Sequence, residues 1–145
     1  MLPPGTEVVT PLCAPAERVR APADLLAHTL IESDNKRVHR SDRFAANAPA
    51  APEPCGPRLD RGFPSLSAAT EGLGVALEST RLAERELASG RLVRPLRGAC
   101  EDVVYTGHWL VVPRAERYAR PVVLLAGWLG KELGVALDPA SAADM

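Results

Sequence analysis

The sequence predicts an α/β domain, and three patterns indicate this fold class. Between residues 57 and 96, short apolar runs typical of strands alternate with two helical segments, in the order strand–helix–strand–helix–strand with short loops. Residues 103–112 are rich in Val, Tyr, Trp and Thr, which favour strands. After Pro121, apolar residues recur with the period of an α-helix. The 145 residues are enough for one domain with a single core.

The N-terminal part of the chain alternates predicted strands with short connecting segments. Residues 6–12 (TEVVTPL) predict a strand with Pro11 near its end. A connector over residues 14–22 leads into a short helix, for which Pro22 is a favourable first residue. Residues 28–33 (HTLIES) are a short apolar run between polar residues and predict the next strand.

A basic segment follows at residues 34–48, and it allows two interpretations. A weak apolar stripe predicts a short helix over 37–47, in a stretch that carries Lys36, Arg37, His39, Arg40 and Arg43. These charges could contact nucleic acid, but Asp34 and Asp42 lie among them, and short mixed charge runs are usually solvated helix faces. Residues 48–58 contain four prolines in eleven positions and predict a loop.

The clearest pattern begins at Pro57. Residues 57–63 (PRLDRGF) predict a short strand and a turn, after which Pro64 begins a helix that Gly72 can end in the left-handed conformation. The same rules predict three further elements: a buried strand at 74–78, a helix at 81–89 capped by Ser79 or Thr80 and closed by Gly90, and a strand at 91–96.

The last regular elements are the strand at 103–112, which Pro113 ends, and the helix after Pro121. On that helix one face is apolar at the spacing i, i+3, i+4, i+7 and i+11, and it consists of Val122, Leu125, Ala126, Leu129 and Leu133. Residues 137–145 predict a frayed tail.

Charge, apolar runs and cysteine spacing exclude several classes of protein. The net charge of −1 gives no overall field that would attract nucleic acid or anionic lipid. The N-terminus lacks the basic and apolar regions of a signal peptide, and the longest apolar run, Val122–Trp128, is too short to span a bilayer. Cys13, Cys55 and Cys100 form no closely spaced pair, which argues against a disulfide framework or zinc site and favours a reducing cytoplasm.

Motifs for catalysis or cofactor binding are not found, so the sequence predicts a protein that is not an enzyme and needs no cofactor or metal. Gly72 and Gly74 precede a strand, whereas a dinucleotide-binding fingerprint follows one. The three histidines are scattered, and only folding could bring His108 to Cys100. The acidic residues on the predicted helices lie beside arginines and read as solvent-side charges: Glu71, Glu84 and Glu86.

One turn could bind a ligand. Asp60, Arg61, Gly62 and Phe63 lie between a strand end and a helix N-terminus, where free backbone N–H groups favour a carboxylate or phosphate. Arg61 adds positive charge, Phe63 an apolar wall and Ser65 a hydroxyl. Ligands of open α/β sheets gather at such strand ends, but an ordinary strand-to-helix turn would use the same residues.

Several segments together resemble one family. Residues 55–96, with GLGVAL followed by RLAERELASGRLVRPL, resemble the effector-binding half of LysR-type transcriptional regulators, most closely the group around the glycine-cleavage activator. TEVVTPLCAP, PADLLAHTLIES, YTGHWLVVP and the helix after Pro121 are similar to further segments of that family. The resemblance extends over residues 6–136.

The resemblance implies a two-lobed fold like that of type 2 periplasmic binding proteins, with a small effector between the lobes. Residues 1–97 would form the second lobe, and residues 98–136 the strand and helix that return to the first lobe, ahead of the tail. The turn over Leu59, Asp60, Arg61, Gly62 and Phe63, with Ser65, would lie on the effector cleft. The apolar faces of 103–112 and 121–133 would then be partly exposed, because their packing partners are not in this sequence.

Two functions are compatible with this resemblance. The first is the effector-sensing part of a regulator, in a truncated chain that reaches DNA only through a missing N-terminal domain. The second is a stand-alone ligand-binding or dimerising module that modulates full-length regulators. The expected partners are a small effector, such as a carboxylate or amino acid, and another copy of the chain or a full-length regulator, with no role for a membrane.

Overall fold

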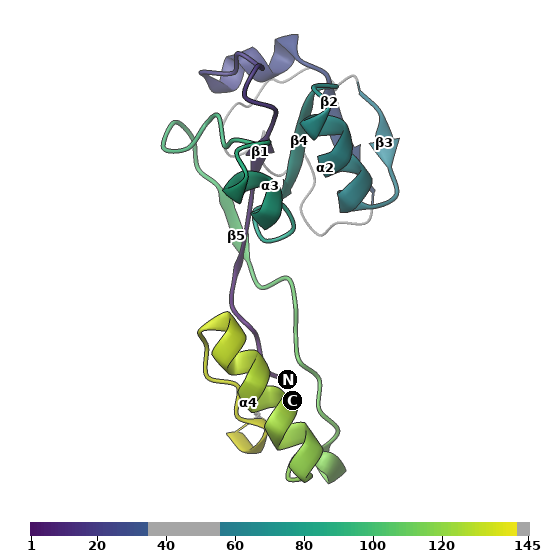
Figure 1. Ribbon diagram of the computed structural model, residues 1–145, viewed down its shortest axis with the longest axis vertical. Coiled ribbons are helices and arrows are strands. Elements are labelled where there is room, and N and C mark those ends of the chain that lie inside the picture. The colour runs from purple at the N-terminus through teal and green to yellow at the C-terminus, as the bar shows by residue number, and fades with distance from the viewer. Residues whose placement is uncertain (35–55, 142–145) are drawn as a thin grey trace. The chain divides into compact units, whose positions relative to one another are not determined.

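The computed structural model describes residues 1–34 and 56–141, which belong to two compact units (Figure 1). Unit 1 consists of Met1–Glu7 and the chain from Tyr105 onwards, and unit 2 consists of Val8–Val104. The helix predicted over 37–47 and most of the loop predicted over 48–58 lie outside the described residues.

A mixed five-stranded sheet is the centre of the fold, with strand order β3-β2-β4-β1-β5. Strand β4 pairs in parallel with β2 and antiparallel with β1, while β3 extends the parallel part beyond β2. In chain order the strands are β1 (Glu7–Leu12), β2 (Leu30–Ser33), β3 (Arg58–Leu59), β4 (Val75–Ser79) and β5 (Val103–Tyr105).

Proline and glycine set the bounds of the main helices. Helix α2 begins two residues before Pro64, and the chain turns away after it at Gly72, whose φ of +73° suits glycine. The helices are η1 (Pro22–Ala27), α2 (Gly62–Thr70), α3 (Glu84–Ala88), η2 (Arg114–Glu116), α4 (Arg120–Leu133) and η3 (Pro139–Ser141), where η marks a 3-10 helix.

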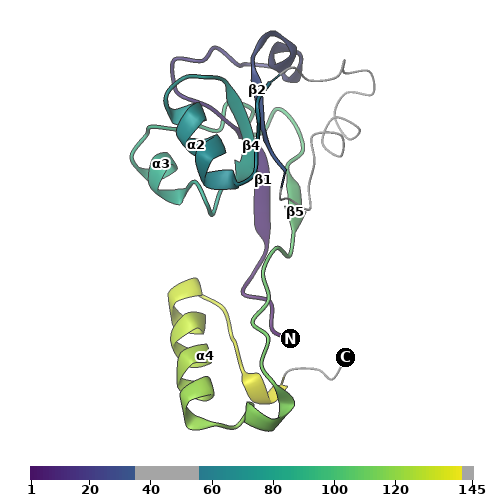
Figure 2. The same ribbon diagram turned by 90° about the vertical axis from the view of Figure 1, so that its right-hand side faces the viewer.

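Unit 2 buries apolar side chains on both faces of its sheet. Neighbouring residues of a strand point to opposite faces, so Ile31 and Leu30 of β2 enter different clusters. The cluster on the α2 and α3 side contains Leu12, Ile31, Leu66, Ala69, Ala76, Ala83 and Leu92. The opposite cluster contains Cys13, Val19, Leu25, Leu30, Val75 and Leu96. Figure 2 shows α2 and α3 on one side of β2, β4 and β1.

Three predicted elements are shorter in the structure than the sequence pattern indicated. Residues 91–96 form no strand, and their contact with the sheet is a single bridge between Val93 and Cys13. The strand predicted over 103–112 is limited to β5, and the helix predicted over 81–89 is limited to α3. Pro95 has no N–H group to donate, so residues 91–96 cannot continue a ladder.

The cap predicted for α3 is formed in part. The Ser79 hydroxyl accepts a hydrogen bond from the N–H of Arg81 at 3.2 Å, within the turn that precedes the helix. The residue at the N-cap position itself is Ala83, which makes no side-chain cap. The serine therefore stabilises the turn between β4 and α3, and the helix begins about one turn later than predicted.

Unit 1 packs α4 onto the N-terminal residues. Its core cluster contains Leu2, Ala126 and Leu137, with partly buried Leu110, Leu129 and Val135 around it. Because Leu137 is buried and residues 139–141 form η3, the frayed tail predicted from residue 137 is wrong for residues 137–141. Residues 142–145 lie outside the described part of the chain.

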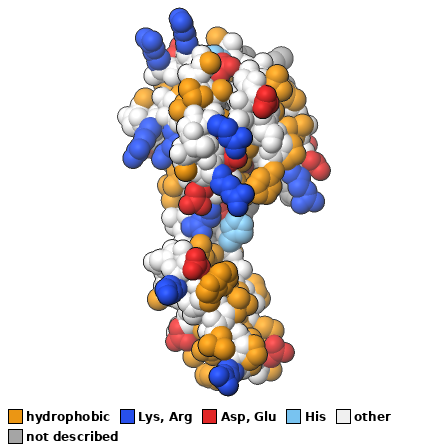
Figure 3. All heavy atoms as spheres, in the orientation of Figure 1, with side chains coloured by type: hydrophobic (Ala, Val, Ile, Leu, Met, Phe, Trp, Pro, Cys, Tyr) orange, Lys and Arg blue, Asp and Glu red, His pale blue; other side chains and the backbone are white. Residues whose placement is uncertain are grey.

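Helix α4 carries exposed apolar side chains, but only some of them belong to the apolar face that the sequence predicted. Of the predicted apolar face, Ala126 is fully buried, whereas Leu125 and Leu133 are 52% and 38% exposed. Leu124 and Trp128 are more exposed still. Leu124, Leu125 and Trp128 lie together on the helix surface, at spacings of one, three and four residues, and are called the α4 stripe below. Figure 3 shows hydrophobic side chains at the surface of this part of the molecule.

Candidate functional site

The predicted ligand-binding residues lie on one turn between β3 and α2. Leu59 ends β3 and packs against the α2-side core, while Asp60 and Arg61 are exposed in the turn. Phe63 projects from the first turn of α2 and is 64% exposed. Ser65 is fully buried, and its hydroxyl donates to the backbone carbonyl of Arg61 at 3.3 Å, so it braces the turn rather than facing solvent.

Three polar side chains that sequence reasoning missed lie beside this turn. Thr10 of β1 is the direct antiparallel partner of Glu78 of β4, so the two side chains share a face of the sheet. On the other side of β4, Ser33 of β2 donates its hydroxyl to Glu78 Oε1 at 2.7 Å. Thr10, Glu78 and Ser33 form the polar row, and they are 1%, 3% and 1% exposed, respectively.

The polar row lies under the N-terminus of α2. Glu78 shares its face with Ala76, which packs in the same cluster as Leu66 of α2. A Cβ atom at Gly62 would lie 3.1 Å from Glu78 Oε2, so the carboxyl group closely approaches the first turn of α2. Arg61, at the N-cap, provides no side-chain cap. The carboxylate therefore faces the positive end of the helix dipole from within the protein.

The row also lies at the carboxyl ends of the parallel strands β2 and β4. Ser33 is the last residue of β2, and Glu78 is the last but one of β4. In open α/β sheets this edge is where ligands bind. A sequence signal existed in part, because Glu78 directly follows the buried apolar run of β4, where a charged residue is unusual. The pairing of strands that brings Thr10 and Ser33 to it could not be read from the sequence.

Hydrogen bonding in the row is incomplete. The Thr10 hydroxyl is buried and has no hydrogen-bond partner among the described residues. Buried polar atoms are almost always paired, because an unmet hydroxyl costs roughly 1–3 kcal/mol. Thr10 therefore keeps the capacity for one further polar contact directly beside the Glu78 carboxyl group.

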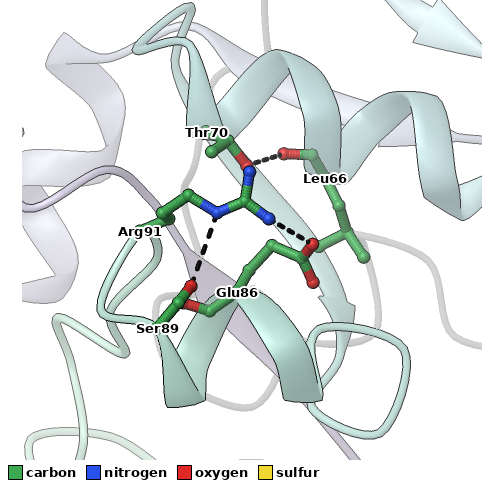
Figure 4. Close-up of polar contacts among 5 residues, drawn as sticks. All are labelled: Leu66, Thr70, Glu86, Ser89 and Arg91. Carbon is green, nitrogen blue, oxygen red and sulfur yellow. Dashed lines mark hydrogen bonds and ion pairs between the residues drawn. The ribbon is translucent and has the colours of Figure 1, made fainter.

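A groove between α2 and α3 is lined in part by Phe63. Figure 4 shows the polar contacts in its wall, where Arg91 donates to Glu86 at 3.0 Å and to the Ser89 hydroxyl at 3.4 Å. In the same view the Thr70 hydroxyl donates to the carbonyl of Leu66 at 2.7 Å. These contacts hold the walls of the groove in place. Phe63 is the one aromatic side chain among the described residues that line the groove.

Among the described residues, Cys13 is buried, while Cys100 and His108 have polar partners. Burial and the nearby Glu17 carboxylate raise the pKa of the Cys13 thiol to about 11, so this thiol stays protonated at neutral pH and is a poor nucleophile. The Cys100 thiol donates to the carbonyl of Leu96, and His108 pairs with Glu7. Within residues 1–34 and 56–141 no cluster of three potential metal ligands occurs, and no helix there is long and apolar enough to cross a membrane.

Residues 5–134 match the family model of the LysR substrate binding domain. The chain belongs to this family. Two relatives are the uncharacterized HTH-type transcriptional regulator y4mQ of Sinorhizobium fredii, 44% identical over 91% of this chain, and the HTH-type transcriptional regulator PerR of Escherichia coli, 43% identical over 92%. The chain spans 45% and 46% of their lengths, respectively. The prediction that the chain resembles LysR-type regulators rather than enzymes is confirmed.

Solved LysR effector domains share the fold. The effector domain of AmpR from Pseudomonas aeruginosa is 29% identical, with a TM-score of 0.71 over 92% of this chain and 64% of that domain. The CrgA regulatory domain of Neisseria meningitidis, at 15% identity, has a TM-score of 0.66 over 92% of this chain and 68% of its own. The predicted α/β fold of the periplasmic-binding-protein type is therefore confirmed for this LysR substrate binding domain.

Proposed function

We propose that the chain is the effector-sensing part of a LysR-type transcriptional regulator and that a small effector binds at the turn formed by Leu59, Asp60, Arg61, Gly62 and Phe63, above Ser65. The observation that carries this proposal is the location of the turn. It lies at the carboxyl ends of β2 and β4, beside a buried polar row with an unmet hydroxyl, in a chain that belongs to the LysR substrate binding domain family.

The remaining parts of the chain fit this proposal. Residues 1–97 would be the second lobe, and residues 98–136 the strand and helix that return to the first lobe. Unit 2 extends over Val8–Val104, so it ends seven residues later than the predicted lobe, and Met1–Glu7 belong to unit 1 instead. The exposed α4 stripe of unit 1 has the character of a face that packs on further protein, which supports a C-terminal segment that returns to the first lobe. DNA would be bound by a helix-turn-helix domain of the regulator, and the free thiols of Cys13 and Cys100 suit a reducing cytoplasm.

The GLGVAL and RLAERELASGRLVRPL segments support assignment to the glycine-cleavage-activator group of the family. Within the proposal, the effector is a small carboxylate or an amino acid. The exposed Arg61 can bind a carboxylate, and Phe63 gives the turn an apolar wall.

Glycine is the probe that tests this site. In a titration of the ¹⁵N-labelled chain with glycine, followed by NMR, we expect the largest amide shifts at residues 59–65, with Arg61→Gln weakening the response several-fold because it removes the guanidinium. Arg81→Gln in the neighbouring groove is the matched control and should leave the response unchanged. Shifts spread over the surface, or confined to other elements, would refute the turn as the effector site.

A second function, a module that modulates full-length regulators, is favoured by the α4 stripe. Three large apolar side chains on one helix face form a patch that soluble proteins rarely leave bare, and a LysR-type relative could cover it. We expect the chain to co-elute with full-length PerR in size-exclusion chromatography and to change its binding to operator DNA. The double variant Leu124→Ser/Trp128→Ser should lose both effects, whereas Leu73→Ser, on the exposed surface of unit 2, should keep them. If the wild-type chain neither co-elutes with PerR nor changes its binding to operator DNA, this function is excluded.

A further inference from the structure

We propose that the α4 stripe is a dimer interface for two copies of this chain, in which the two α4 helices pack antiparallel about a twofold axis. Such a dimer goes beyond effector sensing and does not depend on the effector site. It concerns the 145-residue chain itself, so a full-length relative, or the rest of a first lobe, would compete with the second copy for the same stripe.

The stripe lies on the side of α4 that faces away from the core of unit 1. Ala126 is fully buried in that core. An α-helix turns by about 100° per residue, so Leu124 and Trp128, each two positions from Ala126, point to the opposite side. They are 62% and 57% exposed, and Leu125 beside them is 52% exposed. This side of the helix is therefore open to a partner.

The sequence of α4 is self-complementary when two copies run antiparallel. In such a pair, residues lie opposite each other when they are equally far from the middle of the helix, which for Arg120–Leu133 lies between residues 126 and 127. Trp128 of one copy then lies opposite Leu125 of the other, and the twofold axis repeats the same contact. The aromatic and aliphatic side chains of the stripe thus cover each other on both sides of the axis.

The charges at the two ends of α4 complement each other in this arrangement. Arg120 begins the helix and Glu132 is its last residue but one; both are exposed, and neither forms an ion pair within the described part of the chain. Antiparallel packing brings Glu132 of each copy to the N-terminus of the other α4, where Arg120 and the positive end of the helix dipole attract a carboxylate. Lys131 lies about 100° further round the helix, at the edge of the interface. A parallel pair would instead place Arg120 beside Arg120.

The size of the interface predicts a weak dimer. Helix α4 has 14 residues and is therefore about 21 Å long. One pair of such helices buries less surface than the roughly 1,600 Å² of a standard protein–protein interface. We therefore expect a Kd on the order of 10 µM, so that monomer and dimer exchange as the concentration changes.

Sedimentation velocity of the 145-residue chain between about 1 and 500 µM tests the dimer. We expect the mass to rise from the monomer value of 15.4 kDa to a plateau at twice that value, because a twofold pair leaves no second stripe open for a third copy. Leu124→Ser/Trp128→Ser should stay monomeric over the whole range. Leu73→Ser, which removes an exposed leucine from unit 2, should dimerise as the wild-type chain does.

A charge swap tests the antiparallel arrangement. Arg120→Glu and Glu132→Arg should each weaken the dimer about threefold to tenfold, since the twofold axis doubles the effect of one lost ion pair, and the variant that carries both should recover most of the affinity. Each substitution places a charge that the helix dipole favours at its own end of α4, so a weaker dimer cannot come from loss of the helix. Arg97→Glu, the same change on the exposed surface of unit 2, should have no effect.

Three results would overturn the proposal. The first is a chain that stays monomeric at about 500 µM, or whose mass grows past the dimer without a plateau. The second is a dimer that Leu124→Ser/Trp128→Ser does not weaken, because it uses another surface. The third is a pair of single charge variants that dimerise like the wild-type chain, or a double variant that recovers nothing, because the helices are then not antiparallel. The glycine titration is independent of all three, so the effector site is judged separately.

Discussion

Replacing Gly74 by alanine is expected to destabilise unit 2 by about 3–5 kcal/mol, a large fraction of the stability of a small domain. Gly74 has a φ of +144°, which residues with a side chain rarely adopt. A Cβ atom there would lie 2.1 Å from the carbonyl oxygen of Thr29, far inside van der Waals contact. That same oxygen accepts a hydrogen bond from the N–H of Val75 at 2.8 Å, so the clash would break this hydrogen bond between the starts of β2 and β4.

Gly72, two residues earlier, is the matched control for this substitution. Its φ is also positive, at +73°, but a Cβ atom at Gly72 would point into open space, with no contact within 4 Å. Gly72→Ala therefore carries only the backbone cost of the left-handed conformation, about 1–2 kcal/mol. Urea unfolding followed by circular dichroism gives both values from the shift of the midpoint. Equal losses for the two variants would contradict the close approach of Gly74 to β2.

The second large effect is expected at Leu66, where alanine should cost about 2–5 kcal/mol. Leu66 is 3% exposed and lies in the contact between α2 and the sheet, in one cluster with Ile31 and Ala76. The substitution leaves a cavity that the rigid strands beneath cannot close. Because α2 also carries Gly62 and Phe63, the loss of this contact would loosen the candidate effector site as well.

Leu73→Ala is the control for Leu66, because it removes the same side chain from a position that is 62% exposed, just beyond the same helix. We expect this control to stay within about 0.5 kcal/mol of the wild-type chain. Thermal unfolding monitored by circular dichroism measures both variants. A loss below about 1 kcal/mol for Leu66→Ala would mean that α2 is not held to the sheet by the packing described.

Elements with local signals could be predicted from the amino-acid sequence. Helix α2 begins two residues before Pro64 and ends two residues before Gly72. The buried apolar runs at 6–12, 28–33 and 74–78 correspond to β1, β2 and β4 within one or two residues. Proline geometry, glycine conformation and hydrophobic periodicity act over a few residues, so these elements and the α/β class could be predicted without knowledge of the packing. The candidate site residues were also chosen from a local pattern, the junction between a strand and a helix, and they lie at the turn between β3 and α2.

Where the strands end and which polar residues meet depends on the tertiary packing. A strand forms only where a neighbour offers ladder hydrogen bonds, and residues 91–96 and 106–112 meet the sheet or the N-terminal segment at isolated bridges. The polar row is the clearest case, because Ser33 and Glu78 are 45 positions apart and meet through the parallel register of β2 and β4. The register of a strand depends on the whole sheet, so it cannot be predicted from local sequence patterns.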